Sequence, residues 1–374
     1  MKRLQWNTLI GQDRIKEVLS AAFAGETLGH AYLFCGETGT GTFAAALDLT
    51  MGLLCENNEF QPCGTCNACR KVLAFSHPDF HVVMPLSLQK EHKGSDGRIT
   101  EAGWNEFSLQ VKKRLEDPYH IPEFTTLPSI PVDWIREVTH AVRRGTVEKG
   151  KNIVILDGVE SMQQESANAM LKTLEEPPKD TLLLLCTERV HAVLPTIVSR
   201  CQLLRFGMLP PGQIKTGLID RYAVRSDDPD LPRVVHTGSL GRARLALVQS
   251  ATDEQRFSGE FWECIASGDR AAVFEKIDEI SSSGDYAAYE SLFIQLMYGI
   301  RNSFFSKIDG TGNYILGKVI PGDSFSDTAS PRPVEELLRC CESAIGNIRA
   351  RANISLVLTN FAITVMEILH GKKQ

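Results

Sequence analysis

The feature that most restricts the possible folds is an alternation of short apolar runs with helix-like stretches over about the first 205 residues. Four of the apolar runs have the length of strands, and their near-continuous apolar character is typical of strands covered on both faces. They span residues 31–35, 80–84, 152–156 and 181–186. Strands that alternate with helices predict an α/β domain, in which helices wrap a parallel sheet.

Outside these runs the pattern changes in three places. Residues 87–129 are mostly polar with one helix-like stretch, and we expect them to form a surface insertion. "MLPPGQ" contains Pro210–Pro211 and predicts a hinge into a small helical unit, because proline interrupts regular structure. Everything beyond that unit reads as amphipathic helices. The sequence therefore predicts an α/β domain over residues 1–207, a helical unit over 208–250 and an all-α domain over 251–374.

Composition excludes several classes of protein. The formal net charge of −6 argues against a generally basic protein that coats DNA, although a local basic patch is compatible with it. There is no uninterrupted apolar stretch of about 18 residues, so we expect no membrane span. The first residues, "MKRLQWNTLIGQDR", lack the apolar centre of a signal peptide. We expect a cytoplasmic protein, in which Cys35 and Cys186 are buried free thiols.

Four of the ten cysteines form one dense group. "CENNEFQPCGTCNAC" places Cys55, Cys63, Cys66 and Cys69 in the pattern C-x7-C-x2-C-x2-C. Gaps of two residues let successive thiolates turn onto one ion, and four thiolates complete the tetrahedral shell of a structural zinc. The alternatives are four free thiols or an iron–sulfur cluster, which normally has a cysteine followed by proline that this group lacks. We expect zinc without a catalytic role.

The stretch "HAYLFCGETGTGTFAAALDLT" has the layout strand, glycine-rich loop and helix, as in the phosphate-binding loop G-x-x-x-x-G-K-[ST]. Gly36, Gly39 and Gly41 are in register, but the lysine position holds Thr42 and the hydroxyl position holds Phe43. Backbone N–H groups could still approach an anion. Thr42 cannot neutralise phosphate and Phe43 cannot hold magnesium. Two interpretations stay open, a degenerate site for ATP or ADP and a simple tight turn, and neither predicts hydrolysis.

A second defect agrees with the first. The apolar strand in "NIVILDGVESM" ends at Asp157, as in a Walker B motif, but the following position is Gly158. A glutamate there normally orients the attacking water. Glu160 lies two positions further on and should point elsewhere. The sequence therefore has the framework of an ATP-driven motor without its lysine, its magnesium hydroxyl or its base.

Two further motifs carry a specific resemblance. "SANAMLKTLEEPP" and "PTIVSRC", together with the degenerate loop, resemble the clamp-loader branch of the AAA+ superfamily, and within it the delta-prime family of bacterial DNA polymerase III. The resemblance is good over residues 1–86 and 130–250, weak over the insertion and only architectural beyond. It implies an AAA+ module with a zinc module at about residues 55–70, a helical lid and a helical collar for oligomerisation.

The resemblance also implies roles for single residues. In that family the Ser-Arg-Cys motif supplies an arginine finger to the ATP site of a neighbouring subunit, which assigns this role to Arg200, between Ser199 and Cys201. An always-charged guanidinium can stabilise charge that develops on a γ-phosphate. The alternative is a structural salt bridge. Thr187 matches the sensor 1 position and Arg242 matches sensor 2, and without a competent site both could be structural.

The function implied is that of a non-hydrolysing stator of the replicative clamp loader. Its expected partners are the tau/gamma ATPase subunits and the delta subunit, with the sliding clamp and primed DNA reached through the assembled complex. One alternative is an ATP-hydrolysing tau/gamma-type subunit, against which Thr42, Phe43 and Gly158 argue. Another is a stand-alone zinc-containing DNA-binding protein, but no interleaved aromatic and basic residues surround the cysteines.

Overall fold

A computed structural model gives the structure of the chain. It describes residues 3–57, 60–87, 92, 99–122, 128–148, 150–228, 230–248, 253–283, 286, 288–290, 292–294, 296–297, 300 and 332–370. The chain divides into two compact units. The first consists of Met1–Arg225 with Gly238–Leu245, and the second of Ser226–Thr237 with Ala246–Gln374. No helix in the described part of the chain is both long enough and apolar enough to cross a membrane.

The first unit is built on a five-stranded sheet with the order β4-β5-β6-β2-β7. All neighbouring strands in it are parallel. The strands are β2 (Ala31–Cys35), β4 (Phe80–Val83), β5 (Asn152–Leu156), β6 (Thr181–Thr187) and β7 (Gln202–Arg205). The predicted parallel sheet and its four strands are confirmed, whereas β7 was not predicted. β7 lies at the sheet edge and its residues are half-buried or exposed, so it lacks the apolar run that identified the others.

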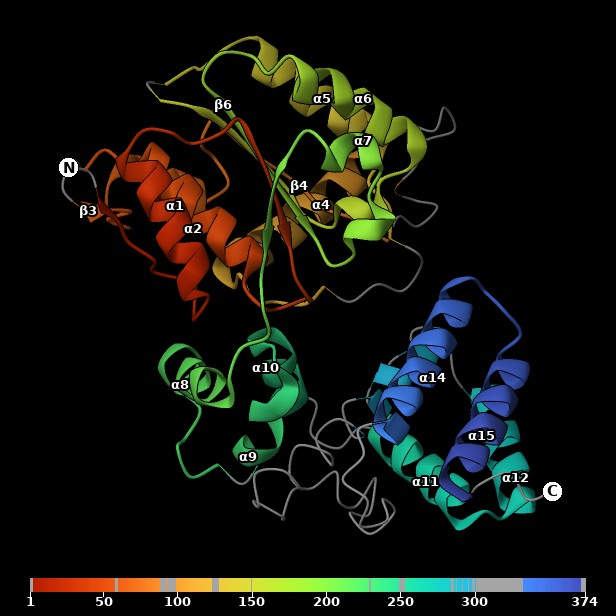
Figure 1. The fold of residues 1–374 in the computed structure, drawn as a ribbon. Coiled ribbons are helices and arrows are strands. Elements are labelled where there is room, and N and C mark those ends of the chain that lie inside the picture. Colours follow the sequence, from red (N-terminus) through yellow and green to blue (C-terminus); the bar gives the residue numbers. More distant parts are fainter. Residues whose placement is uncertain are drawn as a thin grey trace. The chain divides into compact units, whose positions relative to one another are not determined.

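Helices cover both faces of this sheet, with α1 and α2 on one side and α5 and α6 on the other (Figure 1). The helices of the first unit are α1 (Asp13–Ala24), α2 (Thr42–Leu54), α3 (Asn67–Leu73), α4 (Glu101–Glu116), α5 (Val132–Arg143), α6 (Gln164–Glu175), α7 (Pro195–Val198), α8 (Pro211–Tyr222) and the beginning of α10 (Leu240–Val248). A short strand near the start, β1 (Arg3–Leu4), pairs with β3 (Phe60–Gln61). Helix α6 ends at Glu175, two residues before Pro177–Pro178, because proline cannot continue a helix.

The described elements of the second unit are helical, as predicted. They include α9 (Leu231–Val234), α11 (Asp253–Ser267), α12 (Arg270–Ser283), α14 (Arg332–Arg349) and α15 (Ile354–His370). Large apolar side chains of α11, α12, α14 and α15, and of the described residues between 289 and 300, form one core, in which the rings of Phe293 and Phe361 have centroids 4.8 Å apart. Residues 301–331 of the predicted collar lie outside the described residues. The predicted boundaries at residues 207 and 250 stay predictions.

The helix-like stretch expected within residues 87–129 forms α4, which packs one face against the rest of the first unit. Its apolar face is buried, with Phe107, Val111 and Leu115 no more than 5% exposed. The Phe107 ring lies 4.3 Å from that of Trp134 on α5, measured between centroids. Burial of this face against aromatic side chains stabilises the placement of α4 on the first unit. Parts of the predicted insertion, at residues 88–91, 93–98 and 123–127, lie outside the described residues.

Candidate functional site

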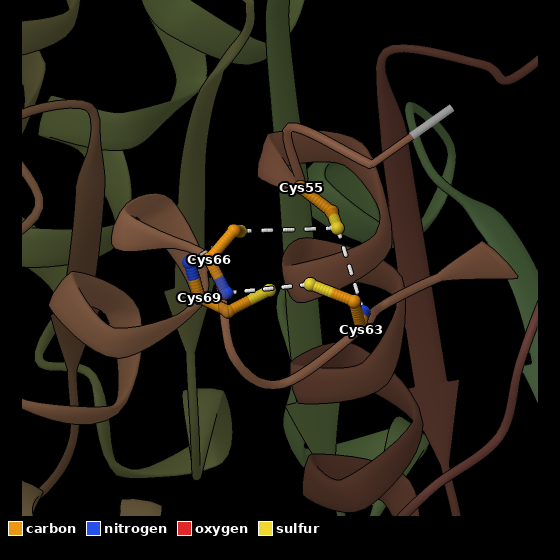
Figure 2. A group of neighbouring side chains, drawn as sticks. All are labelled: Cys55, Cys63, Cys66 and Cys69. Carbon is orange, nitrogen blue, oxygen red and sulfur yellow. Dashed lines mark hydrogen bonds between the residues drawn. The ribbon is translucent and has the colours of Figure 1, made fainter. Parts of the chain in front are cut away.

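Four cysteine side chains of the first unit form a compact cluster (Figure 2). Their sulfur atoms all lie within 4.8 Å of one another and belong to Cys55, Cys63, Cys66 and Cys69. Four sulfur ligands at the usual Zn–S distance would stand roughly 3.8 Å apart in a tetrahedron. The cluster therefore has the number, type and proximity of ligands needed to hold one metal ion.

Backbone N–H groups point at three of these sulfur atoms. Asn57 N and Cys63 N each donate to Cys55 Sγ at 3.4 Å. Cys66 N donates to Cys63 Sγ at 3.4 Å, and Cys69 N donates to Cys66 Sγ at the same distance. Hydrogen bonds to sulfur favour the thiolate over the thiol. The local backbone is thus arranged to stabilise the form of cysteine that binds metals.

Two opposing effects act on the pKa values in this cluster. The N–H groups of Thr65 and Cys66 lower the pKa of Cys63 to about 6. Burial, by contrast, raises the pKa of Cys55 and of Cys69. Two buried thiols can release their protons at neutral pH only if a nearby cation compensates the charge. A metal ion held by all four sulfur atoms would provide that compensation.

The cysteine cluster connects the end of α2 to the start of the chain. Cys55 is the residue that follows α2, and the short strand β3 lies between Cys55 and Cys63. Asn7 Nδ2 donates to Pro62 O at 3.0 Å, next to the pairing of β3 with β1. A closed shell of four ligands leaves no position for substrate or water. An ion bound here would hold local structure together and would take no part in catalysis.

The glycine-rich loop between β2 and α2 is packed against other parts of the protein. A Cβ atom added to Gly39, where φ is +75°, would lie 2.6 Å from Ser239 Oγ. One added to Gly41, where φ is +111°, would lie 2.7 Å from Leu9 Cδ1 and 3.2 Å from Tyr119 Oη. Glycine permits such backbone conformations and close approaches. In this structure the atoms that approach the glycines of the loop closely belong to other residues of the protein.

Arg114, near the end of α4, lies between Phe43 and Asp157. Its Cζ is 4.6 Å from the centroid of the Phe43 ring, and its Nε donates to Asp157 Oδ2 at 3.0 Å. Its Nη1 donates to Pro118 O at 2.9 Å and also to His120 O. In a P-loop ATPase the hydroxyl and the acidic residue at the two corresponding positions hold magnesium. Here a buried side-chain cation interacts with both positions.

The position after Asp157 could not easily accept the missing glutamate. Gly158 has φ of +65°, and an added Cβ would lie 2.9 Å from Pro85 Cγ. Residues other than glycine rarely adopt this backbone conformation. Glu160 is engaged elsewhere, because its Oε1 accepts a hydrogen bond from Glu188 N at 3.2 Å. Neither residue provides a base next to Asp157.

The structure brings the predicted nucleotide-site residues together around adjacent strand ends. Gly36 N donates to Thr187 O at 3.0 Å, which joins the loop to the end of β6. Arg242 Nη1 forms an ion pair with Glu37 Oε2 at 2.9 Å, which joins α10 to the loop. The residues gathered here are Gly36, Gly39, Gly41, Thr42, Asp157, Thr187 and Arg242. Their contacts are with the protein itself, and nucleotide binding by them stays a prediction.

Arg200 comes just after α7, and its polar contacts are with α6, α7 and the residue that follows α7. Its Nη2 pairs with Glu175 Oε1 at 2.6 Å, and its Nη1 donates to Thr196 O at 2.9 Å. The side chain of Arg200 is 34% exposed and that of Glu175 is 48% exposed. A solvent-exposed ion pair contributes only about 0–1 kcal/mol to stability. Arg200 is therefore partly accessible at the surface, in an ion pair that adds little to stability.

Sequence reasoning missed Arg114, Asp117 and Tyr119, which lie beside the loop. Asp117 Oδ1 accepts a hydrogen bond from the Tyr222 hydroxyl at 2.7 Å, and Tyr119 is fully buried. The available signal was the apolar spacing of α4, because a helix with one apolar face packs on a core. That signal identifies a helix that packs on a core, but it does not show which residues the end of the helix contacts.

The family described as "DNA polymerase III, delta subunit" matches residues 11–210, which is more than half of the 374-residue chain. The chain belongs to this family. The DNA polymerase III subunit delta' of Bacillus subtilis is 31% identical over 210 residues, which cover 56% of this chain and 52% of that relative. The subunit delta' of Escherichia coli is 29% identical over 235 residues, or 62% of this chain and 58% of that relative.

The resemblance to delta-prime subunits predicted from the motifs is thus confirmed, although the chain matches only a little over half the length of these relatives. Among solved structures, a gamma subunit-related protein of Thermotoga maritima is similar over 93% of this chain and 98% of its own, with 14% identity and a TM-score of 0.43. A likeness at that TM-score supports no conclusion about this chain.

Proposed function

We propose that the chain is a non-hydrolysing stator of a replicative clamp loader, with an AAA+ module as its first domain. In this role it supplies Arg200 in trans to the ATP site of a neighbouring subunit while a sliding clamp is loaded onto primed DNA. The observation that carries the proposal is a contrast within the first unit. The chain's own site has protein side chains at the magnesium positions, whereas Arg200 is partly exposed at the surface.

The contacts of Arg200 suit a finger better than a structural salt bridge. Its pair with Glu175 is exposed on both sides, so breaking the pair costs little. The carbonyl of Thr196 holds one end of the guanidinium, which limits its freedom before a partner arrives. A planar guanidinium can then donate two parallel hydrogen bonds to phosphate oxygens. Glu175 would release Arg200 when a nucleotide of the neighbour comes into reach.

The absence of catalysis in the chain's own site follows from three positions. Thr42 brings no charge, Phe43 is buried and has no metal ligand, and Gly158 has no base. A positive charge on the phosphates, a metal ligand and a base each contribute to phosphoryl transfer in P-loop ATPases. We assign the four-cysteine cluster to a structural zinc ion, since its ligand set is the one that closed zinc sites use.

The family supports partners of the same complex. We propose that the second, helical unit takes part in a collar with tau/gamma-type ATPase subunits and a delta subunit, in the cytoplasm. The clamp and primed DNA would be reached through that assembly. The competing functions are an active tau/gamma-type motor, or a zinc-containing protein that binds DNA alone.

Two measurements on the purified full chain separate these functions. Phosphate release from ATP should stay at background, whereas turnover near 1 per second, an ordinary enzymatic rate, would indicate the active motor. The isolated chain should not bind primed DNA tightly, and tight binding would favour the stand-alone DNA-binding protein. Adding the chain to tau/gamma-type and delta subunits should complete an assembly that loads clamps, and omitting it should abolish loading.

A further inference from the structure

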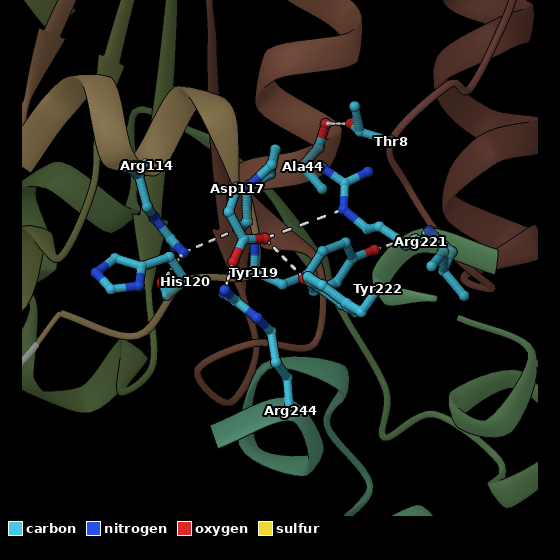
Figure 3. Close-up of polar contacts among 11 residues, drawn as sticks. Thr8, Ala44, Arg114, Asp117, Tyr119, His120, Arg221, Tyr222 and Arg244 are labelled. Carbon is cyan, nitrogen blue, oxygen red and sulfur yellow. Dashed lines mark hydrogen bonds and ion pairs between the residues drawn. The ribbon is translucent and has the colours of Figure 1, made fainter. Parts of the chain in front are cut away.

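The segment after α4 ties the glycine loop to two later helices of the first unit. The carboxylate of Asp117 is the centre of these contacts (Figure 3). Its Oδ1 accepts from the Tyr222 hydroxyl at 2.7 Å and lies 4.0 Å from Arg221 Nε, both at the end of α8. Its Oδ2 pairs with Arg244 Nη1 on α10. One half-buried anion therefore contacts two helices that the sequence assigns to the lid.

The side chain three residues before Asp117, that of Arg114, carries a positive charge. Arg114 is buried, with its side chain only 5% exposed, and it pairs with Asp157 at the end of β5. Its guanidinium carbon Cζ lies over the ring of Phe43, the only aromatic residue of α2. Arg114 thus places a positive charge beside the loop, and Asp117 places a negative charge against α8 and α10.

Tyr119, two residues after Asp117, packs against the glycine loop and the start of the chain. The Tyr119 hydroxyl accepts from Ile10 N at 2.8 Å, and the ring is fully buried. A Cβ added to Gly41 would lie 3.2 Å from that hydroxyl, and one added to Gly241 would collide with Tyr119 O. The loop itself contacts α10 directly, since Gly241 N donates to Gly39 O at 3.2 Å. Loop, segment and lid helix are therefore in mutual contact.

In P-loop ATPases a magnesium nucleotide makes the corresponding connections, with the metal between loop and acidic residue and the phosphates facing arginines. We propose that the segment Arg114–Tyr119 is a built-in ligand that occupies the glycine loop in place of a magnesium nucleotide and holds α8 and α10 closed on it. Arg114 takes the place of the cation and Asp117 that of the anion. The first unit then keeps one conformation whether or not ATP is present, independently of what Arg200 does.

Hydrogen exchange on the full chain tests this proposal, since exchange reports local opening. Millimolar Mg-ATP or Mg-ADP should leave exchange in the loop and in α8 and α10 of the wild type unchanged. Asp117→Asn should raise exchange in α8 and in residues 239–245 by about 5- to 100-fold, the range expected when a charged hydrogen-bond partner is removed. Exchange in β2 and β6 should not change.

Asp220→Asn is the matched control, because it makes the same charge change at an exposed position of α8. Exchange in this variant should equal that of the wild type. If Asp117→Asn does not fold, Tyr222→Phe decides the matter. This variant deletes only the Tyr222 hydroxyl, which donates to Asp117. It should raise exchange in α8 by about 2- to 10-fold, as for one neutral hydrogen bond. Protection of the wild-type loop by Mg-ATP would overturn the proposal, as would unchanged exchange in a folded Asp117→Asn or in Tyr222→Phe.

Discussion

The guanidinium of Arg114 lies over the ring of Phe43, with Cζ 4.6 Å from the ring centroid. The aromatic residue at the magnesium-hydroxyl position is thus part of a buried cation–π contact. A lysine at Thr42, one residue away in the sequence, would add a second positive charge near Arg114. The departures from the P-loop pattern therefore fit one another, because the fold uses these positions for internal packing.

Restoring the hydroxyl should destabilise the protein and not activate it. Phe43→Ser removes a fully buried ring and leaves a cavity under Arg114, and we expect it to lower the free energy of unfolding by about 3–5 kcal/mol. Phe274→Ser, at a position that is 47% exposed, should change it by less than about 0.5 kcal/mol. Urea denaturation gives both values. ATP hydrolysis by folded Phe43→Ser would contradict this account of the loop.

Restoring the base should fail for a different reason. Gly158→Glu forces a side chain onto a backbone with φ of +65° and towards Pro85, so we expect a loss of roughly 1–3 kcal/mol in the free energy of unfolding. Gly212→Glu is the control, because an added Cβ there meets nothing within 4 Å. An acidic residue in the first turn of α8 should be neutral or slightly stabilising. Equal stability of the two variants would mean that Gly158 is not constrained.

The cysteine cluster should carry about one zinc ion per chain when the protein is purified without chelator, as expected of a single four-thiolate site. Elemental analysis identifies the metal, and iron in its place would indicate a cluster. Cys63→Ser should lose the metal and lower the midpoint of thermal unfolding, because the ends of α2 and β3 lose their link. Cys340→Ser, at a half-buried free thiol, should keep the metal. The metal site would be ruled out if the purified wild type carried no metal and a chelator left its thermal unfolding midpoint unchanged.

Stability should fall in mild acid through His77. Burial lowers the pKa of His77 below the usual 6.5, so the unfolded chain binds its proton at a higher pH than the folded chain. Between these two pKa values the unfolded state holds more protons, and the free energy of unfolding falls with falling pH, by at most about 1.4 kcal/mol per pH unit.

His77→Asn removes the titration but keeps an acceptor for Asp79 N, which donates to His77 Nδ1 at 3.2 Å. From about pH 7.5 to about pH 5.5, His77→Asn should lose less stability than the wild type. The exposed control His191→Asn should follow the wild type. Parallel curves for the wild type and His77→Asn would contradict the assignment.

The parts of the fold that could be predicted were those with a local signal. Strand β6 is a run of seven buried residues, and the spacing of the four cysteines brings their sulfur atoms together within a short segment. The contacts around the loop have no such signal. Arg114 and Asp157 are 43 residues apart, and Asp117 and Tyr222 are 105 apart. A charged residue near the end of a helix is usually solvated, so only the packing of α4 reveals that Arg114 is buried.

The central claim is that Arg200 acts on a neighbouring subunit. The test uses the assembled complex, with Arg200→Ala in place of the wild-type chain and partners left unchanged. Size measurement should show normal assembly, because an exposed ion pair contributes little to folding. Arg136→Ala is the matched control, since Arg136 is 66% exposed and pairs with Asp133 on the surface.

The deciding measurement is the ATPase rate of the assembled complex in the presence of clamp and primed DNA. An arginine finger can be worth roughly 10³–10⁵ in rate at its own site, so the complex with Arg200→Ala should lose the turnover of the adjoining site and load clamps poorly. Arg200→Lys should restore little, because an ammonium lacks the planar fork, and Arg136→Ala should match the wild type. If the complex with Arg200→Ala assembles and hydrolyses ATP at the wild-type rate, Arg200 is a surface salt bridge and the proposed role in trans is wrong.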